Sequence, residues 1–272
     1  MDKLQSCLAA AGIDLWGVCA YRDCLPLRPC RAASRIPPEA KSVLVCLFPY
    51  YTEEFPRRNV ARYAVPDDYH QVAGGILMKA AEALSGAYPG EAFAPFVDNS
   101  PIREVRAAAL AGLGALGRHH MLIHPGYGSY LFIGSIVTTL ELAPASAGPV
   151  SCADCGRCIA ACPTGALQKG AGFRRELCRS YITQKKGTLN EWETQQVRQG
   201  GLVWGCDRCL DACPMNKREK SPVRAFHRNA TPLFTPANLR ELMLHKAYGY
   251  RGEAVLLRNY RILTGEPAAE QE

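Results

Sequence analysis

The first half of the chain alternates between two patterns of apolar and polar residues, one typical of strands and one typical of helices. Short apolar runs of strand character are separated by segments that carry apolar residues at helical spacing. In the last of these segments Pro101 stands in the first turn, where a helix tolerates proline, and glycines follow the last apolar position. This alternation is typical of an α/β domain. The expected strands are 15–20, 42–50, 93–98 and 129–142, and the expected helices are 2–11, 67–88 and 101–114.

The composition indicates a globular protein outside the membrane. The chain has 272 residues, of which 48% are apolar and 21% charged, as in soluble globular proteins. Asp14 interrupts the apolar start, so no targeting segment is visible. The run YLFIGSIVTTLEL is too short and too β-branched to span a bilayer. We therefore expect a cytoplasmic protein with no membrane partner.

One class of cofactor is excluded by the glycine pattern. No G-x-G-x-x-G motif follows an expected strand, so the dinucleotide-binding fingerprint is absent. The stretch AGLGALG is rich in glycine, but it follows a helix instead of a strand. A helix end and turn explain it better than a phosphate-binding loop.

The strongest chemical signal is the spacing of thirteen cysteines. Five lie in residues 7–46 and are interpreted as small buried hydrophobic residues. The other eight lie between residues 152 and 213, and a cytosolic protein rarely forms that many disulfides, so the spacing indicates metal or redox chemistry. Residues 151–163 carry the C-x2-C-x2-C-x3-C-P run of bacterial ferredoxins. Residues 205–214 repeat part of it, and Cys178 supplies the eighth thiol.

This run predicts two [4Fe-4S] clusters with crossed ligands. Three cysteines of a run hold one cluster, and the fourth ligates the other. The first cluster is then held by Cys152, Cys155, Cys158 and Cys213. The second is held by Cys162, Cys178, Cys206 and Cys209. Zinc bound by paired C-x2-C motifs is the alternative, but zinc ribbons do not usually repeat this run. Two such clusters form a path for single electrons.

The net charge gives little support by itself for a nucleic-acid partner. The formal value of +7 counts the cysteines as neutral. Two clusters with four thiolates each would lower it to about +3. A nucleic-acid surface would therefore depend on local basic runs, which are usually solvated surface. These runs lie at residues 174–175, 185–186 and 216–220.

Two further residues are candidates for chemistry. Asp98 ends an expected strand just before a helix, where an N-cap or a turn-forming role is the ordinary interpretation. The helix dipole would lower its pKa, whereas a general acid needs a raised pKa, which only burial in an apolar pocket would supply. His70 lies in DYHQVAG, close to the D-x-H-x-x-G run that offers histidine to cobalamin. Ala73 replaces the glycine of that run, so we favour a structural role for His70.

Several blocks of the sequence match the motifs of one known family. RYAVPDDYH is similar to the family's R-Y-A-x-G-x-D-Y-H. PFVDNSPIREVRAAALAGLGALGRH is similar to its P-F-V-D-S-A-P-x-x-E-x-x-x-A-x-x-A-G-L-G-W-x-G-K. GSYLFIGSIVTT and GCDRCLDACPMN are similar to its G-S-x-x-F-L-G-E and G-C-D-x-C-x-x-x-C-P-x-N stretches. The blocks span roughly residues 60–220. Together they resemble the epoxyqueuosine reductases, which are cobalamin-dependent iron–sulfur enzymes of tRNA modification related to reductive dehalogenases.

The resemblance implies an α+β chain in three parts. An α/β cobalamin-binding domain would cover 1–148, a ferredoxin-like domain with two [4Fe-4S] clusters 149–222, and a short helical segment 223–272. Cobalamin bound base-off at the interface of the first two domains would receive electrons through the clusters. An external donor such as ferredoxin or flavodoxin would supply them. The implied reaction converts epoxyqueuosine to queuosine in tRNA.

The resemblance also implies roles for single residues. Asp98 matches the family's proton donor above the cobalt, which implies a catalytic role and a contact with the cofactor. Four other residues match motif positions that the resemblance implies line the cobalamin, namely Arg62, Tyr63, Ser180 and Asp207.

Departures from the family's pattern put the tRNA substrate in question. Ala115, Arg118 and Ser135 stand where the family has tryptophan, lysine and glutamate, and the glycine of R-Y-A-x-G is replaced within RYAVPDD. The 59 residues after Cys213 leave only a short tail, whereas many members continue into repeats that help hold tRNA. The alternatives are a corrinoid iron–sulfur reductase acting on a small molecule and a two-cluster electron carrier or activator.

Overall fold

The computed structural model describes residues 3–144, 151–170 and 172–266. The chain forms two compact units, and each is assembled from stretches that are distant in sequence. The first unit comprises Met1–Tyr50, Tyr69–Asp154 and Met215–Val223. The second comprises Tyr51–Asp68, Cys155–Pro214 and Arg224–Glu272.

The units are defined by packing, whereas the expected boundaries separate cofactor sites. The expected boundary at residue 148 lies outside the described residues. The division of the chain into 1–148, 149–222 and 223–272 by cofactor therefore stays a prediction.

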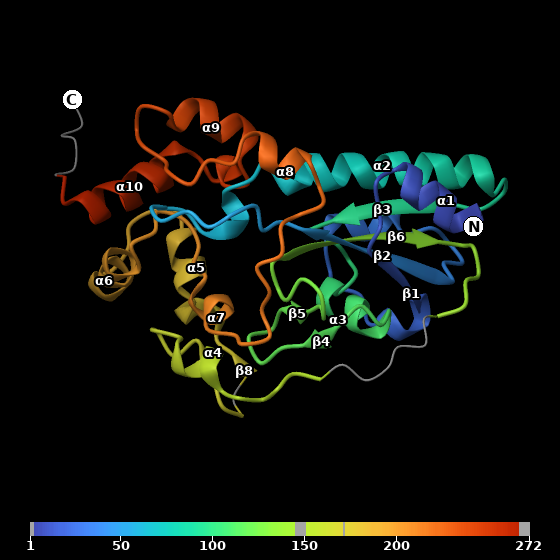
Figure 1. The fold of residues 1–272 in the computed structure, drawn as a ribbon, viewed down its shortest axis with the longest axis horizontal. Helices are drawn as coiled ribbons and strands as arrows, with labels where there is room; N and C mark the ends of the chain where they lie inside the picture. Colours follow the sequence, from blue (N-terminus) through green and yellow to red (C-terminus); the bar gives the residue numbers. More distant parts are fainter. Residues whose placement is uncertain (1–2, 145–150, 171, 267–272) are drawn as a thin grey trace. The chain divides into compact units, whose positions relative to one another are not determined.

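A four-stranded sheet forms the centre of the first unit, in the order β1-β2-β6-β3 (Figure 1). All its pairings are antiparallel, and the pairing of β2 with β6 runs from Ser42 opposite Thr138 to Pro49 opposite Leu131. The four expected strands are confirmed to within a few residues at each end. They are β1 (Trp16–Ala20), β2 (Ser42–Pro49), β3 (Phe93–Val97) and β6 (Leu131–Thr138).

Helices cover both faces of this sheet (Figure 1). On one face α1 (Lys3–Ala10) packs on α2 (Tyr69–Ala87), which lies against β3 and β6. On the other face α3 (Glu104–Leu110) packs beside the hairpin of β4 (Ala115–Leu116) and β5 (Leu122–Ile123). Because side chains of a strand alternate between faces, every second residue of β2 joins the core under α3. That core includes Val43, Val45, Leu47, Ile102, Ala107 and Ala108.

The expected helix at 101–114 is shorter than its pattern suggested. Pro101 was expected in its first turn, but α3 begins at Glu104. The hydroxyl of Ser100 accepts a hydrogen bond from the N–H of Ile102, and the carbonyl of Pro101 accepts one from Arg28. The bond from Arg28 occupies the carbonyl of Pro101, which in a helix starting there would accept from the N–H of Val105.

The second unit is built from short helices around the cysteine runs. Its apolar core joins residues from all three of its stretches, among them Val60, Trp204, Phe234 and Tyr248. α6 begins with a capping box, in which Asn190 and Glu193 satisfy each other's backbone N–H groups. The helices are α4 (Arg157–Ala160), α5 (Arg179–Thr183), α6 (Glu191–Gly200), α7 (Arg208–Asp211), α8 (Ala225–Arg228), α9 (Leu239–His245) and α10 (Glu253–Thr264).

Short 3-10 turns and a small hairpin complete the described elements. The hairpin consists of β7 (Leu167–Gln168) and β8 (Gly172–Phe173). The turns are η1 (Tyr21–Cys24), η2 (Arg31–Arg35), η3 (Arg62–Ala64), η4 (Arg175–Leu177) and η5 (Gly249–Arg251). Among the described residues, no helix has the length and apolar character that crossing a bilayer requires.

Gly17 in β1 tests the packing of α3 against the sheet. A Cβ atom there would overlap the carbonyl oxygen of Ala111, just past the end of α3. Gly17→Ala should therefore lower the free energy of unfolding by about 1–3 kcal/mol, as overpacking does. Urea denaturation followed by circular dichroism measures this change.

The matched control is Gly75→Ala in α2. A Cβ atom at Gly75 meets nothing within 4 Å, and alanine favours a helix over glycine by roughly 1 kcal/mol. The two substitutions should therefore shift stability in opposite directions, and equal shifts would contradict the described packing of β1.

Candidate functional site

The eight clustered cysteines lie at the ends of short helices. Cys158 lies in α4 and Cys209 in α7, and these two helices pack against each other. Cys178 immediately precedes α5. Cys152 belongs to the first unit, and the second unit contains Cys155, Cys158, Cys162, Cys178, Cys206, Cys209 and Cys213.

The four cysteines predicted for the second cluster lie within electrostatic reach of one another. Burial raises the pKa of Cys209 to about 12, and the neighbouring Cys206, Cys178 and Cys162 act in the same direction. Burial also raises the pKa of Cys206, with Cys178 adding to the effect. Thiolates gathered in this way repel one another unless a cation lies among them. The arrangement therefore fits a positively charged iron centre, which binds cysteine as thiolate.

A zinc site, the alternative to the clusters, would hold a single metal ion. Within residues 3–144, 151–170 and 172–266, no three Cys, His, Asp or Glu side chains are arranged to hold one metal ion. A tetrahedral zinc site needs its sulfur atoms at about 2.3 Å from one ion.

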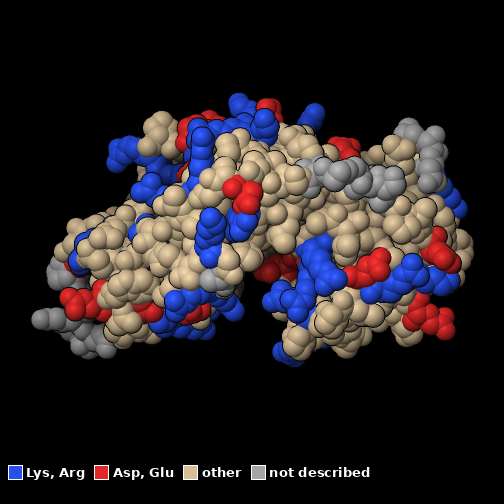
Figure 2. Space-filling view, turned by 90° about the horizontal axis from the view of Figure 1, so that it is seen from below, with Lys and Arg blue, Asp and Glu red and all other residues tan. Residues whose placement is uncertain are grey.

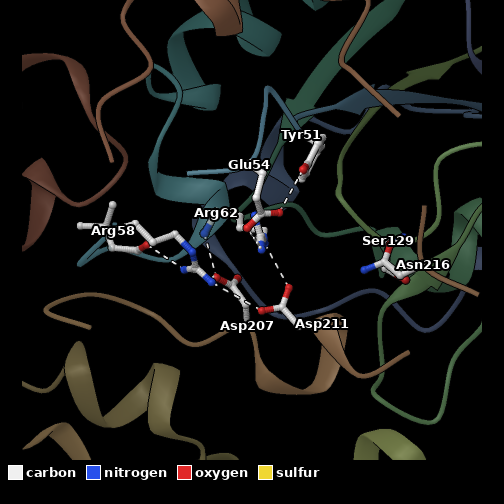
Figure 3. Close-up of polar contacts among 9 residues, drawn as sticks. Tyr51, Glu54, Arg58, Arg62, Ser129, Asp207, Asp211 and Asn216 are labelled. Atoms are coloured by element: carbon white, nitrogen blue, oxygen red, sulfur yellow. Dashed lines mark hydrogen bonds and ion pairs between the residues drawn. The ribbon is translucent and has the colours of Figure 1, made fainter. Parts of the chain in front are cut away.

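A network of buried ion pairs holds the loop of the second cysteine run (Figure 3). Asp207, between Cys206 and Cys209, is only 3% exposed. Its Oδ2 accepts a hydrogen bond from Nη1 of Arg58 at 2.6 Å and one from the backbone N–H of Arg62 at 2.9 Å. The network thus joins the 51–68 stretch to the cysteine loop.

The side chain of Arg62 extends the same network. Its Nε donates to Oδ1 of Asp211 at 3.0 Å, and its Nη2 donates to Oε1 of Glu54 at 2.9 Å. Glu54 also accepts a hydrogen bond from the hydroxyl of Tyr51. Arg62 and Asp207, two of the predicted cofactor contacts, are therefore buried and bonded to protein groups.

Tyr63 and Ser180, the other two predicted contacts in this unit, lie together. The Tyr63 hydroxyl is beside Ser180 and Trp204, and burial raises its pKa. Both side chains are half-buried. A Cβ atom on Gly205 would overlap Ala61 and would also crowd the ring of Tyr63. This explains why glycine precedes Cys206.

Asp98 lies on a turn of unusual backbone conformation in the first unit. Asp98 and the following Asn99 both have positive φ values, 47° and 31°, which L-residues other than Asn and Asp rarely adopt. The N-cap of α3 is Arg103, so the N-cap interpretation of Asp98 is wrong. The positive φ values instead place Asp98 in a bend between β3 and α3.

Two side chains at the start of α2 hold this carboxylate. The Tyr69 hydroxyl donates to Oδ2 of Asp98 at 3.0 Å, and Nε2 of His70 lies 3.2 Å from the same oxygen. Tyr69 is itself stacked between His70 and Phe132, with ring centroids 4.1 Å and 4.2 Å away. His70, interpreted as structural from the sequence, is therefore a direct partner of the candidate catalytic residue.

These contacts decide the charge of Asp98. The hydrogen bond from His70 lowers its pKa to about 2, with Asn99 and Tyr69 acting in the same direction against burial. The side chain is 55% exposed. Asp98 is therefore ionised at neutral pH, and a role as proton donor requires that a proton reach it first.

Three positions at which the sequence departs from the family's motifs lie in the first unit. Ala115 and Ser135 are buried. Arg118 forms a salt bridge to Asp154, with Nη2 donating to Oδ2 at 2.7 Å. Arg118 thus reaches the loop between Cys152 and Cys155.

A second contact links two sequence blocks of the first unit (Figure 3). The side-chain oxygen of Asn216 accepts a hydrogen bond from the N–H of Ser129 at 2.7 Å. A Cβ atom on Gly128 would overlap Asn216. The Gly-Ser pair and the C-P-x-N asparagine therefore fit each other directly.

Of the five N-terminal cysteines, Cys19, Cys24 and Cys46 are buried as expected, and Cys7 and Cys30 are half-buried.

Two family models match the chain. The model for "Epoxyqueuosine reductase QueG, DUF1730" matches residues 31–99, and the model for "4Fe-4S double cluster binding domain" matches residues 151–216. The epoxyqueuosine reductase of Gloeobacter violaceus is 36% identical over 192 residues, which are 69% of this chain and 60% of that protein. That of Salmonella typhimurium is 30% identical over 217 residues, 76% of this chain and 56% of that protein.

The chain belongs to the epoxyqueuosine reductase family.

Membership in the epoxyqueuosine reductase family confirms the resemblance and assigns two [4Fe-4S] clusters to residues 151–216. The chain spans about half the length of the curated relatives it matches, 44% to 60% for eight of them. Its activity and substrate are therefore treated below as proposals.

Solved structures of the epoxyqueuosine reductase family share the fold. The Streptococcus thermophilus structure has a TM-score of 0.80 at 24% identity, over 96% of this chain and 80% of that chain. A catabolic reductive dehalogenase has a TM-score of 0.50 at 18% identity, over 96% of this chain and 37% of that chain. The mixed helix and sheet fold with a double-cluster domain is thereby confirmed.

Sequence reasoning missed several residues of these sites. Arg58 and Asp211 carry no local signal, because their partner segments are about 150 residues away in sequence. Tyr69 and Glu104 could have been found, since both occupy fixed letters of the D-Y-H and P-x-x-E motifs of the epoxyqueuosine reductases.

Removing Asp207 should damage the cysteine loop. Asp207→Ala leaves Arg58 without its buried partner, and breaking a buried ion pair costs about 3–5 kcal/mol. We expect a lower thermal midpoint and a lower iron content after reconstitution. Differential scanning calorimetry and iron analysis measure the two effects.

The control for this change is Glu176→Gln, which removes an exposed ion pair with Arg174. Exposed pairs contribute little to stability, so this variant should keep its midpoint and its iron. A normal midpoint for Asp207→Ala would show that the network does not support the loop.

Proposed function

We propose that this chain reduces epoxyqueuosine to queuosine in tRNA, with two [4Fe-4S] clusters and cobalamin as cofactors. The observation that carries the proposal is the carboxylate of Asp98, held on a strained turn by Tyr69 and His70. An electron carrier needs no such group. A solved epoxyqueuosine reductase 23% identical to this chain is a complex with an epoxyqueuosine-modified tRNA-Tyr stem loop, which supports the substrate.

The conformation of Asp98 supports a catalytic role. A solved structure of the Bacillus subtilis epoxyqueuosine reductase has its catalytic aspartate loop swung out of the active site. In this chain the positive φ values at Asp98 and Asn99 cost free energy. The bonds from Tyr69 and His70 offset that cost, so they select one position of the turn.

The cluster ligands are proposed from spacing and proximity. Cys162, Cys178, Cys206 and Cys209 would hold one cluster, in accord with their mutual effects on pKa. The crossed assignment gives the other cluster to Cys152, Cys155, Cys158 and Cys213. Clusters of this kind pass single electrons, and an external donor such as ferredoxin or flavodoxin would supply them.

The residues of the second unit fit a corrinoid in two ways. Tyr63 and Ser180 are half-buried, polar and adjacent, so they are proposed as direct contacts. Arg62 and Asp207 use their polar atoms on each other's segments, so their proposed role is to fix the loops that carry Tyr63 and the cysteines. When bound, cobalamin supplies a strongly reducing cobalt centre for breaking a C–O bond.

The side chains of this chain would then supply a proton to the reaction. Conversion of an epoxide to an alkene takes up two electrons and two protons and releases water. Asp98 is proposed to deliver a proton to the oxygen that leaves carbon, which prevents the build-up of negative charge there. Tyr69 and His70 orient Asp98 through the same oxygen, Oδ2.

Binding of tRNA is proposed to use several small basic groups. Figure 2 shows Lys and Arg side chains in separate groups on the face it draws, interspersed with Asp and Glu. The exposed residues of the basic runs are Arg174, Arg175, Lys186, Lys217, Arg218 and Lys220. A phosphate backbone contacted in this way makes affinity depend on salt.

The test of the proposal is turnover of a defined substrate. Protein reconstituted with iron, sulfide and cobalamin is incubated with a reductant and an epoxyqueuosine-containing anticodon stem-loop, and nucleosides are analysed by mass spectrometry. Formation of queuosine supports the proposal. Absence of product, with turnover of a small epoxide or organohalide instead, would favour the alternative of a corrinoid iron–sulfur reductase for small molecules.

Asp98→Asn should remove the proton carrier and keep the shape of the side chain. We expect the turnover rate to fall about 10²–10⁴-fold, the usual contribution of a general acid, while cobalamin still binds. Single-turnover kinetics and the absorption spectrum of bound cobalamin measure the two properties. Full activity of the variant would remove Asp98 from the mechanism.

Cys178→Ala should empty one cluster site and leave the other. The wild-type protein should bind about eight irons per chain, and the variant about four. Cys7→Ala is the control, since Cys7 lies outside both runs and its replacement should retain all the iron. Equal iron in both variants would contradict the assignment of Cys178.

A further inference from the structure

Glu104 is a second carboxyl group beside Asp98 that the proposed mechanism leaves without a role. It is the first residue of α3. The carboxyl group of Glu104 accepts a hydrogen bond from the backbone N–H of Asp98. Its Oε1 is fully buried and has no hydrogen-bond partner among the described residues. An ionised carboxylate would place negative charge on this buried oxygen without a hydrogen bond to it, so the geometry favours the neutral acid.

The charges around Glu104 act in the same direction. Burial raises its pKa to about 8, with the negative charge of Asp98 as the second cause. The N–H of Asp98 and the side chains of Arg28 and His70 oppose this shift without reversing it. Asp98, in contrast, has a pKa of about 2. Asp98 on the turn and Glu104 at the start of α3 are therefore two neighbouring carboxyl groups, one ionised and one protonated at neutral pH, which is the pattern of an acid–base pair.

We propose that Glu104 holds the proton that Asp98 delivers, so that the two carboxyl groups act as one pair carrying a single proton. This inference rests on the proposed function. Glu104 acts through Asp98 and is a positioning residue: its carboxyl group holds the N–H of the strained turn and stores the proton close to it. It explains how Asp98, although ionised at rest, serves as a donor.

The proton balance of this step is simple. The O–H bond of Glu104 breaks, an O–H bond forms on Asp98, and the negative charge moves from Asp98 to Glu104. The total charge of the pair stays at −1 until Asp98 gives the proton to the substrate oxygen. Solvent then returns one proton to the pair, and no electron moves among these side chains.

The first test measures the proton on Glu104 without turnover. A carboxyl group whose pKa rises on folding binds its proton more tightly in the folded state than in the unfolded state, where the pKa is about 4.3. Its contribution to stability is therefore largest below pH 4.3 and declines as pH rises towards the folded value, about 8. Glu104→Gln, which has no titrating proton, should lose this decline.

The measurement compares thermal midpoints of the cluster-loaded wild type and Glu104→Gln between about pH 5 and pH 9, roughly the window of the shift. The difference should grow in favour of the variant as pH rises and level off near pH 8. Glu82→Gln, which removes an exposed glutamate of α2, should run parallel to the wild type. A Glu104→Gln curve that also runs parallel would overturn the proposal.

Coupling to Asp98 gives an independent check. The Asp98 charge raises the pKa of Glu104, so the same difference measured in an Asp98→Asn background should level off at lower pH. An unchanged curve would show that the carboxyl groups do not interact, which would also overturn the pair. Carbon-13 NMR of labelled glutamate carboxyl groups follows the same titration if a variant is too unstable to melt cleanly.

The second test uses turnover of the stem-loop. Glutamine keeps an acceptor for the N–H of Asp98 but has no proton to give, so Glu104→Gln should turn over at least roughly tenfold more slowly at pH 7. Glu104→Asp should restore part of the rate. Wild-type rates in Glu104→Gln would overturn the proposal. A wild-type protein that never converts the stem-loop would refute the proposed function, whereas the titrations would still decide the state of Glu104.

Discussion

The second unit depends on one negative charge that is almost sealed from water. Asp207 lies 145 residues after Arg62 and 149 residues after Arg58, and it bonds both. A buried carboxylate of this kind is tolerable only when paired and hydrogen-bonded. Separating Arg58 or Arg62 from Asp207 would therefore leave a buried charge without its partner. The loop of Cys206 and Cys209 is fixed at the same time, because Asp207 stands between them.

Local patterns predicted much of the fold and the metal chemistry. The spacing of the cysteines is a local property, and it was sufficient to locate the double-cluster region. The strands were also found, since β2 is buried along its whole length and reads as a continuous apolar run. The start of α3 was harder, because the N–H of Arg28, from a segment about seventy residues earlier, takes the carbonyl of Pro101, and the apolar pattern does not register such a contact.

The candidate proton site shows where sequence reasoning stops. Asp98 was singled out from the sequence, but its charge could not be. Its pKa depends on Tyr69 and His70, which lie 29 and 28 residues earlier in the chain. The same holds for Glu104, whose pKa reflects burial and the Asp98 charge together. The sequence shows which residue types are present. The protonation state of each carboxyl group, in contrast, depends on neighbours in space that are distant in sequence.

The interleaving of the two units has a consequence for synthesis on the ribosome. The core of the second unit brings Val60 against Trp204, Phe234 and Leu256, so its contacts join residues nearly two hundred positions apart. Contacts of such long range close late and slowly. The cysteine runs therefore emerge before the core of the second unit is complete, and their thiols are free of metal in a partly folded nascent chain. Protection of those thiols from oxidation during translation becomes a requirement of this architecture.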